Sequence, residues 1–522
     1  MGRCFARHAM PLKRTGALLS LMLLTAAALY TGVAHAAQDP ALVKKGEYLA
    51  RAGDCYACHT MPGGKPFAGG STMNTPFGSI SVPNITPDEQ TGIGNWTDDE
   101  FYRAMHEGVR KDGAYLYPVF PFPWYTKVSR DDVMAIKAYL FSLPPENAPR
   151  KPIGLRFPYN IRDTLGAWRT LFFKANDFKP DPKADSRVNR GAYLVEGLGH
   201  CGECHNRHNV RGASQWSGQL EGGEIEGWYA PNLTSDGKTG IGNWSEDDLA
   251  TFLKTGTAPG KGVVLGPMAE TVNDSLRYLT DDDLHAIAAY LKSVPAHETG
   301  KSGKLSEFTG QRPPGSQAYL SNCAYCHQSD GKGIGGEVPA LASNGAVASQ
   351  GPQNVLRIVL GGLPATHGFA PMPAMGASMT DQEVADVVDY VRNSWGNAAA
   401  TATGGGLVHD ERAATHTLMA GDPAGGCPAS TDPQLTKLLD AGGAAELKSV
   451  KQSDLLQVID DLVGKLKQAE PSLSSDAVVN ELTQAYCPVV TADAELNPAE
   501  RARRIGNFAV LVYGQTKSAE FQ

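Results

Sequence analysis

Three copies of the pattern Cys-x-x-Cys-His constrain this chain more than any other feature of its sequence. The copies begin at Cys55, Cys201 and Cys323. The spacing puts two thiols about one helical turn apart, so both can bond the vinyl groups on one edge of a haem. The adjacent histidine then lies under the porphyrin as an iron ligand. A single motif of this kind could instead be a zinc site or a redox dithiol.

Three copies in one chain favour three covalently bound haem c groups over those alternatives. The predicted attachment residues are Cys55, Cys58, Cys201, Cys204, Cys323 and Cys326. The predicted proximal iron ligands are His59, His205 and His327.

The first 36 residues have the pattern of a secretory signal peptide. A cationic start is followed by an apolar run from Gly16 to Tyr30, too short to span a bilayer comfortably, and by the small-x-small pattern Ala34-His35-Ala36. An N-terminal membrane anchor is the alternative. We expect cleavage near Ala37 and a periplasmic protein. The formal net charge of −8, without a dense Lys/Arg run, argues against nucleic acid as a partner.

Each motif is predicted to open a helical domain, which makes the chain mainly α. The expected opening helices cover residues 46–49, 191–194 and 316–320, and the expected closing helices cover 131–141, 281–292 and 381–392. Each closing helix contains a tyrosine, namely Tyr139, Tyr290 or Tyr390. We expect these rings to pack the terminal helices of each domain together.

An internal repeat points to the sixth iron ligand in the second domain. The sequence Thr-Gly-Ile-Gly-Asn-Trp ends at Trp96 and again at Trp244, an offset of 148 residues. Met268 follows Trp244 by 24 residues, and a thioether is a usual partner to histidine on haem iron. In the third domain the predicted ligand is Met372, just before the closing helix, with Met375 and Met379 as competitors.

The same repeat places Phe120 where the first domain would need its sixth ligand. A phenyl ring has no lone pair for iron, so this haem is expected to be open on one side or to take a substitute ligand. Met73 is the better substitute, because Met105 aligns with an apolar repeat position and is expected in the core. His106 is expected to be solvent-exposed.

Prolines follow each motif in a similar context, at Pro83, Pro231 and Pro339. A metal-bound histidine usually donates its other ring N–H to a carbonyl or carboxylate. The carbonyls of these prolines could therefore orient the three motif histidines, or the prolines could simply shape their loops.

Residues 40 to 396 resemble the triheme cytochrome c subunit of membrane-bound bacterial dehydrogenases. That family includes subunits of alcohol, gluconate, sorbitol, fructose and aldehyde dehydrogenases. The resemblance rests on the three motifs, the two Gly-Ile-Gly-Asn-Trp segments, residues 266–270 (Gly-Pro-Met-Ala-Glu) and residues 390–397 (Tyr-Val-Arg-Asn-Ser-Trp-Gly-Asn). The family normally has Met where this chain has Phe120.

The resemblance implies three tandem class I cytochrome c domains, at residues 37–150, 185–297 and 310–397. It implies electron receipt from a dehydrogenase catalytic subunit of flavin, quinone-cofactor or molybdenum type, and delivery to ubiquinone or another respiratory acceptor. It also implies attachment to the periplasmic, outer face of the inner membrane. The chain would then be an electron-transfer subunit and not an enzyme by itself. The alternatives are a haem enzyme that uses an open first site and a free multihaem electron shuttle.

The tail departs from this resemblance. Residues 398–422 are expected as a linker that begins with an Ala/Thr/Gly-rich stretch, and residues 423–522 as a small helical domain. Apolar residues at helical spacing predict helices over 455–466 and 476–485. Cys427 and Cys487 are left over after the motifs and the signal peptide, so an exported chain is expected to pair them in a disulfide. An interaction domain and a stabilising cap are both open as its role.

Overall fold

The structure is a computed structural model of the chain. It describes residues 39–215, 219–259, 261–299, 313–342, 344–397, 403–414, 427, 446–447, 450 and 453–520. The predicted signal peptide, with Cys4, lies outside the described residues. Among the described residues, no helix is long and apolar enough to cross a membrane.

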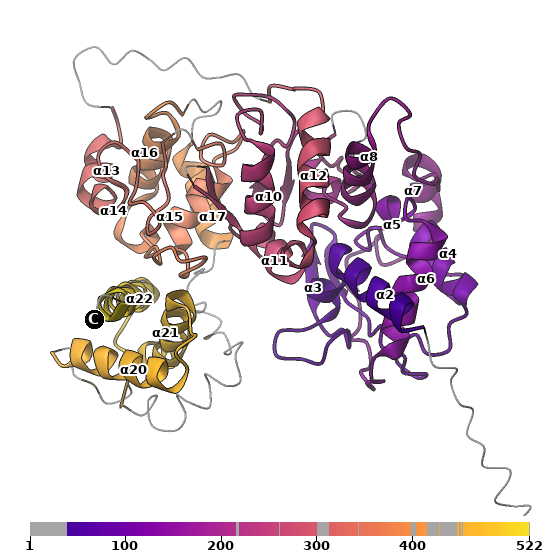
Figure 1. The fold of residues 1–522 in the computed structure, drawn as a ribbon. Helices are drawn as coiled ribbons and strands as arrows, with labels where there is room; N and C mark the ends of the chain where they lie inside the picture. The colour runs from indigo at the N-terminus through magenta and orange to yellow at the C-terminus, as the bar shows by residue number, and fades with distance from the viewer. Residues whose placement is uncertain are drawn as a thin grey trace, which may run out of the picture.

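Each motif lies in a helical unit, and the three units follow one another in chain order (Figure 1). In unit 1 (residues 39–150) the helices are α2 (Pro40–Ala52), α3 (Cys55–His59), α4 (Asp98–Glu107), α5 (Phe122–Tyr125) and α6 (Arg130–Ser142). In unit 2 (residues 185–299) they are α8 (Ser186–Tyr193), the π-helix η2 (Leu194–Leu198), α9 (Gly202–His205), α10 (Glu246–Thr255), α11 (Pro267–Asp274), η3 (Leu276–Tyr278) and α12 (Asp281–Ser293). In unit 3 (residues 313–397) they are α13 (Ser316–Asn322), α14 (Ala324–His327), α15 (Gln353–Gly361), η4 (Gly376–Ser378) and α16 (Asp381–Arg392).

Strands are few and short, so the fold is mainly α, as predicted. Strands β1 (Thr72–Thr75), β2 (Gly78–Ser81) and β3 (Gly154–Leu155) form an antiparallel sheet in the order β1-β2-β3. Two antiparallel pairs belong to unit 2, β4 (Gly223–Ile225) with β5 (Trp228–Ala230) and β6 (Thr257–Ala258) with β7 (Gly262–Val263). A connector between units 1 and 2 carries η1 (Arg162–Thr164) and α7 (Leu165–Phe172).

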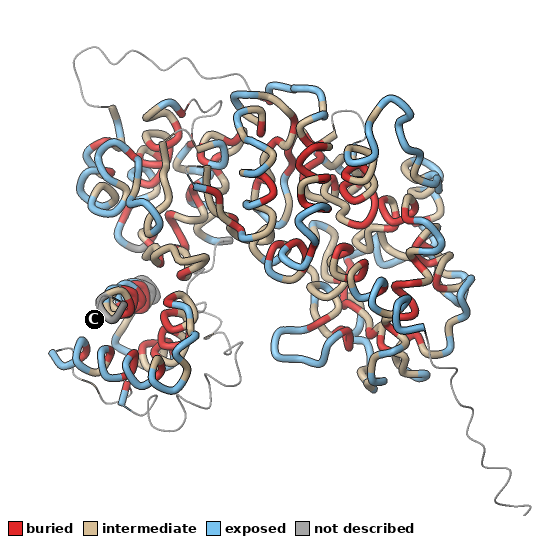
Figure 2. Tube along the Cα trace, in the orientation of Figure 1, coloured by how far each residue is buried: buried red, intermediate tan, exposed pale blue. Residues whose placement is uncertain are grey.

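The closing helices α6, α12 and α16 match the predicted ranges to within one residue at each end. Each begins after a hydroxyl residue, Ser129, Thr280 or Thr380, whose side chain accepts a hydrogen bond from a backbone N–H in the first turn. Such N-caps satisfy donors that the helix itself leaves unpaired. The buried faces of these helices line the cores, as the red segments of Figure 2 show.

The opening and closing helices cross in close contact at a glycine, which explains the Gly-x-Tyr pattern before the first two motifs. A Cβ atom on Gly46 would lie 1.9 Å from the Ala135 carbonyl oxygen. A Cβ atom on Gly191 would lie 1.9 Å from the Ala286 carbonyl oxygen. Both glycines also abut the closing-helix tyrosine, and in unit 3 the Tyr390 ring lies 5.4 Å from that of Tyr319 on the opening helix, so the predicted packing is confirmed.

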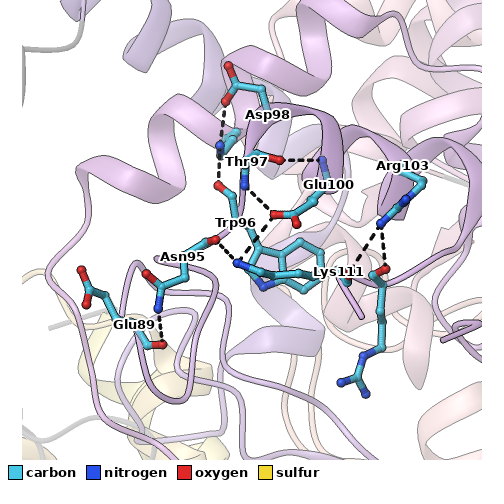
Figure 3. Close-up of polar contacts among 10 residues, drawn as sticks. Glu89, Asn95, Trp96, Thr97, Asp98, Glu100, Arg103 and Lys111 are labelled. Atoms are coloured by element: carbon cyan, nitrogen blue, oxygen red, sulfur yellow. Dashed lines mark hydrogen bonds and ion pairs between the residues drawn. The ribbon is translucent and has the colours of Figure 1, made fainter. Parts of the chain in front are cut away.

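The repeated Gly-Ile-Gly-Asn-Trp segment is a hydrogen-bonded turn that leads into α4 (Figure 3). Asn95 donates its amide N–H to the Glu89 carbonyl over 2.9 Å and accepts a bond at its own carbonyl from Lys111. Thr97 and Glu100 cap α4 reciprocally. The equivalent contacts in unit 2 are Asn243 to Gly237, Lys261 to Asn243, and the capping pair Ser245 and Asp248. The internal repeat in the sequence is therefore also a repeat in the structure.

Units 1 and 2 bind each other through two matching polar clusters. Tyr48 of unit 1 donates to Asp283 of unit 2 over 2.5 Å, and Arg190 holds the same carboxylate with two bonds of 2.7 and 2.8 Å. In the reverse direction, Tyr193 of unit 2 donates to Asp132 of unit 1 over 2.6 Å. Lys45 pairs with that carboxylate at 2.7 Å, so the opening helix of each unit binds the closing helix of the other.

The tail forms a separate helical unit with its own core, called here the C-terminal unit (residues 453–520 with Cys427). Its helices are α20 (Leu455–Ala469), α21 (Ser475–Thr491) and α22 (Pro498–Glu520). The first two confirm the helices predicted from spacing, whereas α22 was not predicted. Cys427 and Cys487 form a disulfide, as expected from their being left over.

Part of the segment expected as a linker is helical instead. Helix α17 (Gly405–Ala414) packs on α15 and α16, and its Val408 is fully buried in the unit 3 core. Arg412 of this helix donates to Asp381 over 2.8 Å and to the Met379 carbonyl over 3.1 Å. These contacts with unit 3 stabilise a helix that begins with two glycines, which are poor helix formers. Residues 398–402 and 415–422 of the expected linker lie outside the described residues.

Candidate cofactor sites

The motif cysteines lie on the short helices α3, α9 and α14 or, for Cys201 and Cys323, directly before them, and each short helix follows the opening helix of its unit. All six are free thiols and none takes part in a disulfide. Burial raises the pKa of Cys55 and of Cys201 to about 12. A Cβ on Gly53 would stand 3.2 Å from Leu198 of unit 2 and 3.4 Å from the Cys55 sulfur, so the first motif adjoins unit 2.

Each motif histidine is hydrogen-bonded through Nδ1 to the carbonyl of the proline identified from sequence. The three bonds are His59 to Pro83 at 2.8 Å, His205 to Pro231 at 2.7 Å, and His327 to Pro339 at 3.3 Å. A carbonyl only accepts, so Nδ1 carries the proton and Nε2 keeps its lone pair. The expectation that these carbonyls orient the histidines is therefore confirmed.

Burial also keeps these imidazoles neutral, the form that can bind iron. It lowers the pKa of His59 to about 4, and it lowers the pKa of His205 and of His327. The hydrogen bond to the proline carbonyl raises the pKa of each histidine, but at all three the lowering by desolvation is larger. At neutral pH each site therefore presents an unprotonated Nε2 in a fixed orientation.

Backbone hydrogen bonds fix the register that aligns Phe120 with Met268. Leu116 donates to the Gly108 carbonyl and Val264 to the Gly256 carbonyl, both over 2.8 Å. Phe120 and Met268 each follow four residues later. Both side chains are partly buried against the shared core of units 1 and 2. Phe120 therefore occupies the same structural position as Met268, which was the basis for expecting no Met ligand there at the first site. The assignment of Met268 as an iron ligand stays a prediction.

In unit 3 the predicted ligand Met372 lies at the base of a short hairpin. Its N–H and carbonyl exchange hydrogen bonds of 3.0 and 2.8 Å with Leu363. Met372 and Met375 are partly buried beside the unit 3 core, whereas Met379 is buried within it. Burial makes Met379 a core residue, and the choice of Met372 over Met375 stays a prediction.

The other candidates for the first site are spread over different elements. Met105 is 6% exposed in the core, as expected. His106 was expected to be exposed, but this is wrong: it is partly buried and its ring stacks on Tyr102 with centroids 4.9 Å apart. The stack follows from their i,i+4 spacing on α4. Met73 is partly buried on β1, paired with Ile80.

Comparison with known proteins identifies relatives of this chain. The cytochrome c family profile matches residues 313–395. The cytochrome c subunit of the quinone alcohol dehydrogenase of Gluconobacter oxydans (strain 621H) is 41% identical over 391 residues, covering 70% of this chain and 82% of the relative. The gluconate 2-dehydrogenase cytochrome c subunit of Pantoea cypripedii is 40% identical, covering 71% and 89%. The fructose dehydrogenase cytochrome subunit of Gluconobacter japonicus is 39% identical, covering 69% and 80%.

This chain belongs to the family of cytochrome c subunits of bacterial dehydrogenases. Membership explains why free thiols and neutral, oriented histidines occur together: a cytochrome c holds haem c covalently through such motifs. The relatives are subunits of dehydrogenase complexes, which implies electron transfer for this cytochrome subunit.

The cytochrome subunit joins its first two sites through a segment that sequence reasoning missed. Trp124 of α5 lies against Gly202 in the second motif, where a Cβ would stand 2.2 Å from its ring. Its indole N–H donates to Glu203 of that motif over 2.7 Å. The next residue, Tyr125, donates to the Gly53 carbonyl over 2.7 Å, beside the first motif. The aromatic run after Phe120 was the available signal.

A second contact of the cytochrome subunit links units 2 and 3. Tyr229 and Asn354 exchange two hydrogen bonds, with the Tyr229 N–H donating over 2.8 Å and its carbonyl accepting over 2.9 Å. Trp228 lies against Gly266, two residues before Met268, on one side and near Arg357 of α15 on the other. Hairpin β4–β5 therefore spans from the Met268 segment to α15 of unit 3.

Proposed function

We propose that this chain is a periplasmic triheme c-type cytochrome, attached to the outer face of the inner membrane. It would pass electrons from a dehydrogenase catalytic subunit to ubiquinone or another respiratory acceptor. The observation that carries the proposal is the same oriented histidine in all three motifs. Haem, when bound, supplies a one-electron iron couple.

The chain's own residues do three things in this proposal. Free thiols in each motif provide two covalent attachment points, giving three tandem class I cytochrome c domains over residues 37–150, 185–297 and 310–397. The proline carbonyls fix each imidazole through Nδ1, which would leave its Nε2 free to hold the iron. Met268 and Met372 would hold the iron at the second and third sites, where a thioether ligand would raise the potential.

The contacts between units favour a relay with the second site in the middle. Trp124 and Tyr125 connect the first unit to the second motif, and Trp228 leads from the Met268 segment to α15. A linear order from first to third site, in either direction, follows from these contacts.

Intact mass of the protein purified from the periplasm tests the haem count. The wild type should carry three haem additions, and replacing both cysteines of one motif by alanine should remove one addition in each of three variants. The Cys427→Ser/Cys487→Ser variant is the matched control, because it removes two cysteines that are bonded to each other. It should retain three additions; a wild type with two or fewer in matured protein would contradict the proposal.

Phe120 supports a second candidate, a haem enzyme whose first site binds a small molecule such as peroxide. Its partly buried ring occupies the register of Met268 and lies 5.4 Å from the Tyr125 ring. Both candidates predict an open first site, so only turnover separates them. Steady peroxide consumption that Phe120→Met abolishes would favour the enzyme, and its absence would leave the relay.

A further inference from the structure

The C-terminal unit touches the rest of the protein at the segment that carries Met372. Asn480 of α21 donates its amide N–H to the Ala365 carbonyl over 2.9 Å. Tyr513 of α22 donates its hydroxyl to the Gly368 carbonyl over 3.2 Å. Ala365 is 2% exposed and belongs to the hydrophobic core of the C-terminal unit rather than to that of unit 3. Figure 1 shows the yellow α22 next to unit 3.

The segment held in this way is a hairpin, residues 362–373, called here the Met372 loop. Its base is closed by the mutual hydrogen bonds of Leu363 and Met372, and its tip by those of Thr366 and Phe369. The tip also reaches unit 2, because the Nε2 of His367 lies 2.4 Å from where a Cβ of Gly256 would stand. Unit 2 and the C-terminal unit therefore both contact the tip of one short loop.

The two contacts of the C-terminal unit are directional. Asn480 and Tyr513 come from different helices, yet both donate to backbone carbonyls within four residues of each other at the loop tip. A third contact lies just beyond the loop, where α22 packs on η4. A cap that only covered apolar surface would not require two donors aimed at the tip of a ligand-bearing loop.

We propose that the C-terminal unit is a clamp that holds the Met372 loop closed over the third haem site, with Asn480 and Tyr513 as positioning residues. The inference rests on the proposed function, in which Met372 is the sixth ligand. An external ligand can replace Met372 only in the fraction of molecules whose loop is open, so the apparent affinity for that ligand reports the open fraction. The clamp keeps that fraction small and the third potential high.

The disulfide fits this role. Cys487 lies two turns after Asn480 on α21 and is fully buried, and its bond to Cys427 holds α21 in the C-terminal unit. If the disulfide forms on export, it would stabilise α21, the helix that carries Asn480.

Imidazole binding to the full-length ferric protein tests the clamp. The readout is loss of the part of the Met-to-iron charge-transfer band that Met372→Ala removes, since Met268 would supply the remainder. Asn480→Leu and Tyr513→Phe should each raise the apparent imidazole affinity of that haem about fivefold, and the double variant about twentyfold, because each removes one hydrogen bond that closes the loop. Met372→Ala sets the upper limit. Tyr513→Phe keeps the ring in the core, so this arm remains readable if Asn480→Leu does not fold.

Tyr486→Phe is the matched control. Tyr486 lies on α21 in the same core, stacked on Phe508 with centroids 4.1 Å apart, and no hydrogen bond joins its hydroxyl to the Met372 loop. It should behave like the wild type. If Met372→Ala leaves the band unchanged, the ligand assignment in the proposed function fails. If Met372→Ala weakens the band but the Asn480 and Tyr513 variants match Tyr486→Phe, the clamp is wrong and the ligand assignment stands.

Discussion

Replacing Asp283 by Asn should destabilise unit 2, where Arg190 holds this carboxylate, and should remove the hydrogen bond by which Tyr48 joins unit 1 to it. The carboxylate accepts two bonds from Arg190 and one from Tyr48, and its side chain is 12% exposed. Breaking a buried ion pair costs about 3–5 kcal/mol. The Arg190 side chain is 36% exposed, so solvent screening reduces the expected loss to about 2–3 kcal/mol.

The pH dependence of this loss follows from the pKa of Asp283. Burial alone would raise that pKa, but the hydrogen bonds from Arg190 and Tyr48 outweigh it and hold the pKa below its ordinary value. The stabilisation is therefore fully present above about pH 4, the ordinary Asp pKa, and is lost as the pH falls through the lowered folded-state pKa. The wild type and the variant should converge in acid.

Thermal unfolding of the haem-loaded protein at neutral pH measures the effect, with an expected drop in Tm of about 5–10 °C for a unit of this size. Asp282→Asn is the matched control, because Asp282 is the exposed neighbour on α12. Tyr48→Phe should lose less than Asp283→Asn, and the double variant should lose less than the sum. Equal Tm values for Asp283→Asn and Asp282→Asn would refute this account of Asp283.

Three further changes have definite outcomes. Gly191→Ala should cost about 1–3 kcal/mol or more in unfolding free energy, because its Cβ would clash with the α12 backbone; a denaturation midpoint equal to wild type would show that α8 can shift freely. Replacing both Cys427 and Cys487 by Ser should cost about 4 kcal/mol for a loop of 60 residues, seen as earlier melting of the C-terminal unit, and an unchanged melt would contradict a stabilising disulfide. Met268→Ala should remove one low-spin Met/His signal and lower one potential; an unchanged spectrum would reject that ligand.

Local patterns in the sequence predicted much of this molecule. The closing helices were recognisable because apolar spacing and an N-cap act within one helix, as at Ser129 and Thr280. The carbonyl partner of His59 was recognisable because a proline in a similar context follows each of the three motifs, and Pro83 is the one after the first. Pairing of Cys427 with Cys487 followed from elimination. The residues that determine the helices are near in sequence, those that fix the histidines repeat along it, and the disulfide required only a count of the cysteines.

What the sequence did not reveal depends on contacts between distant segments. The bond between Trp124 and Glu203 joins two units, and burial there raises the pKa of Glu203 to about 7. Helix α17 lies in a segment of weak helical composition and owes its place to Arg412 and to burial of Val408. The loop contact of Asn480 joins residues 115 apart. No local pattern encodes such pairings.

Spectroelectrochemical titration of the purified full-length protein, with the haems counted on the same sample, tests the central claim most directly. The account predicts three one-electron steps per chain, two at high potential and one lower step from the first site, where Phe120 replaces a thioether. Carbon monoxide should bind the reduced haem of that lower step alone, and Phe120→Met should raise its potential and abolish binding. Fewer than three electrons per chain, or three Met/His haems with no carbon monoxide binding, would contradict the account.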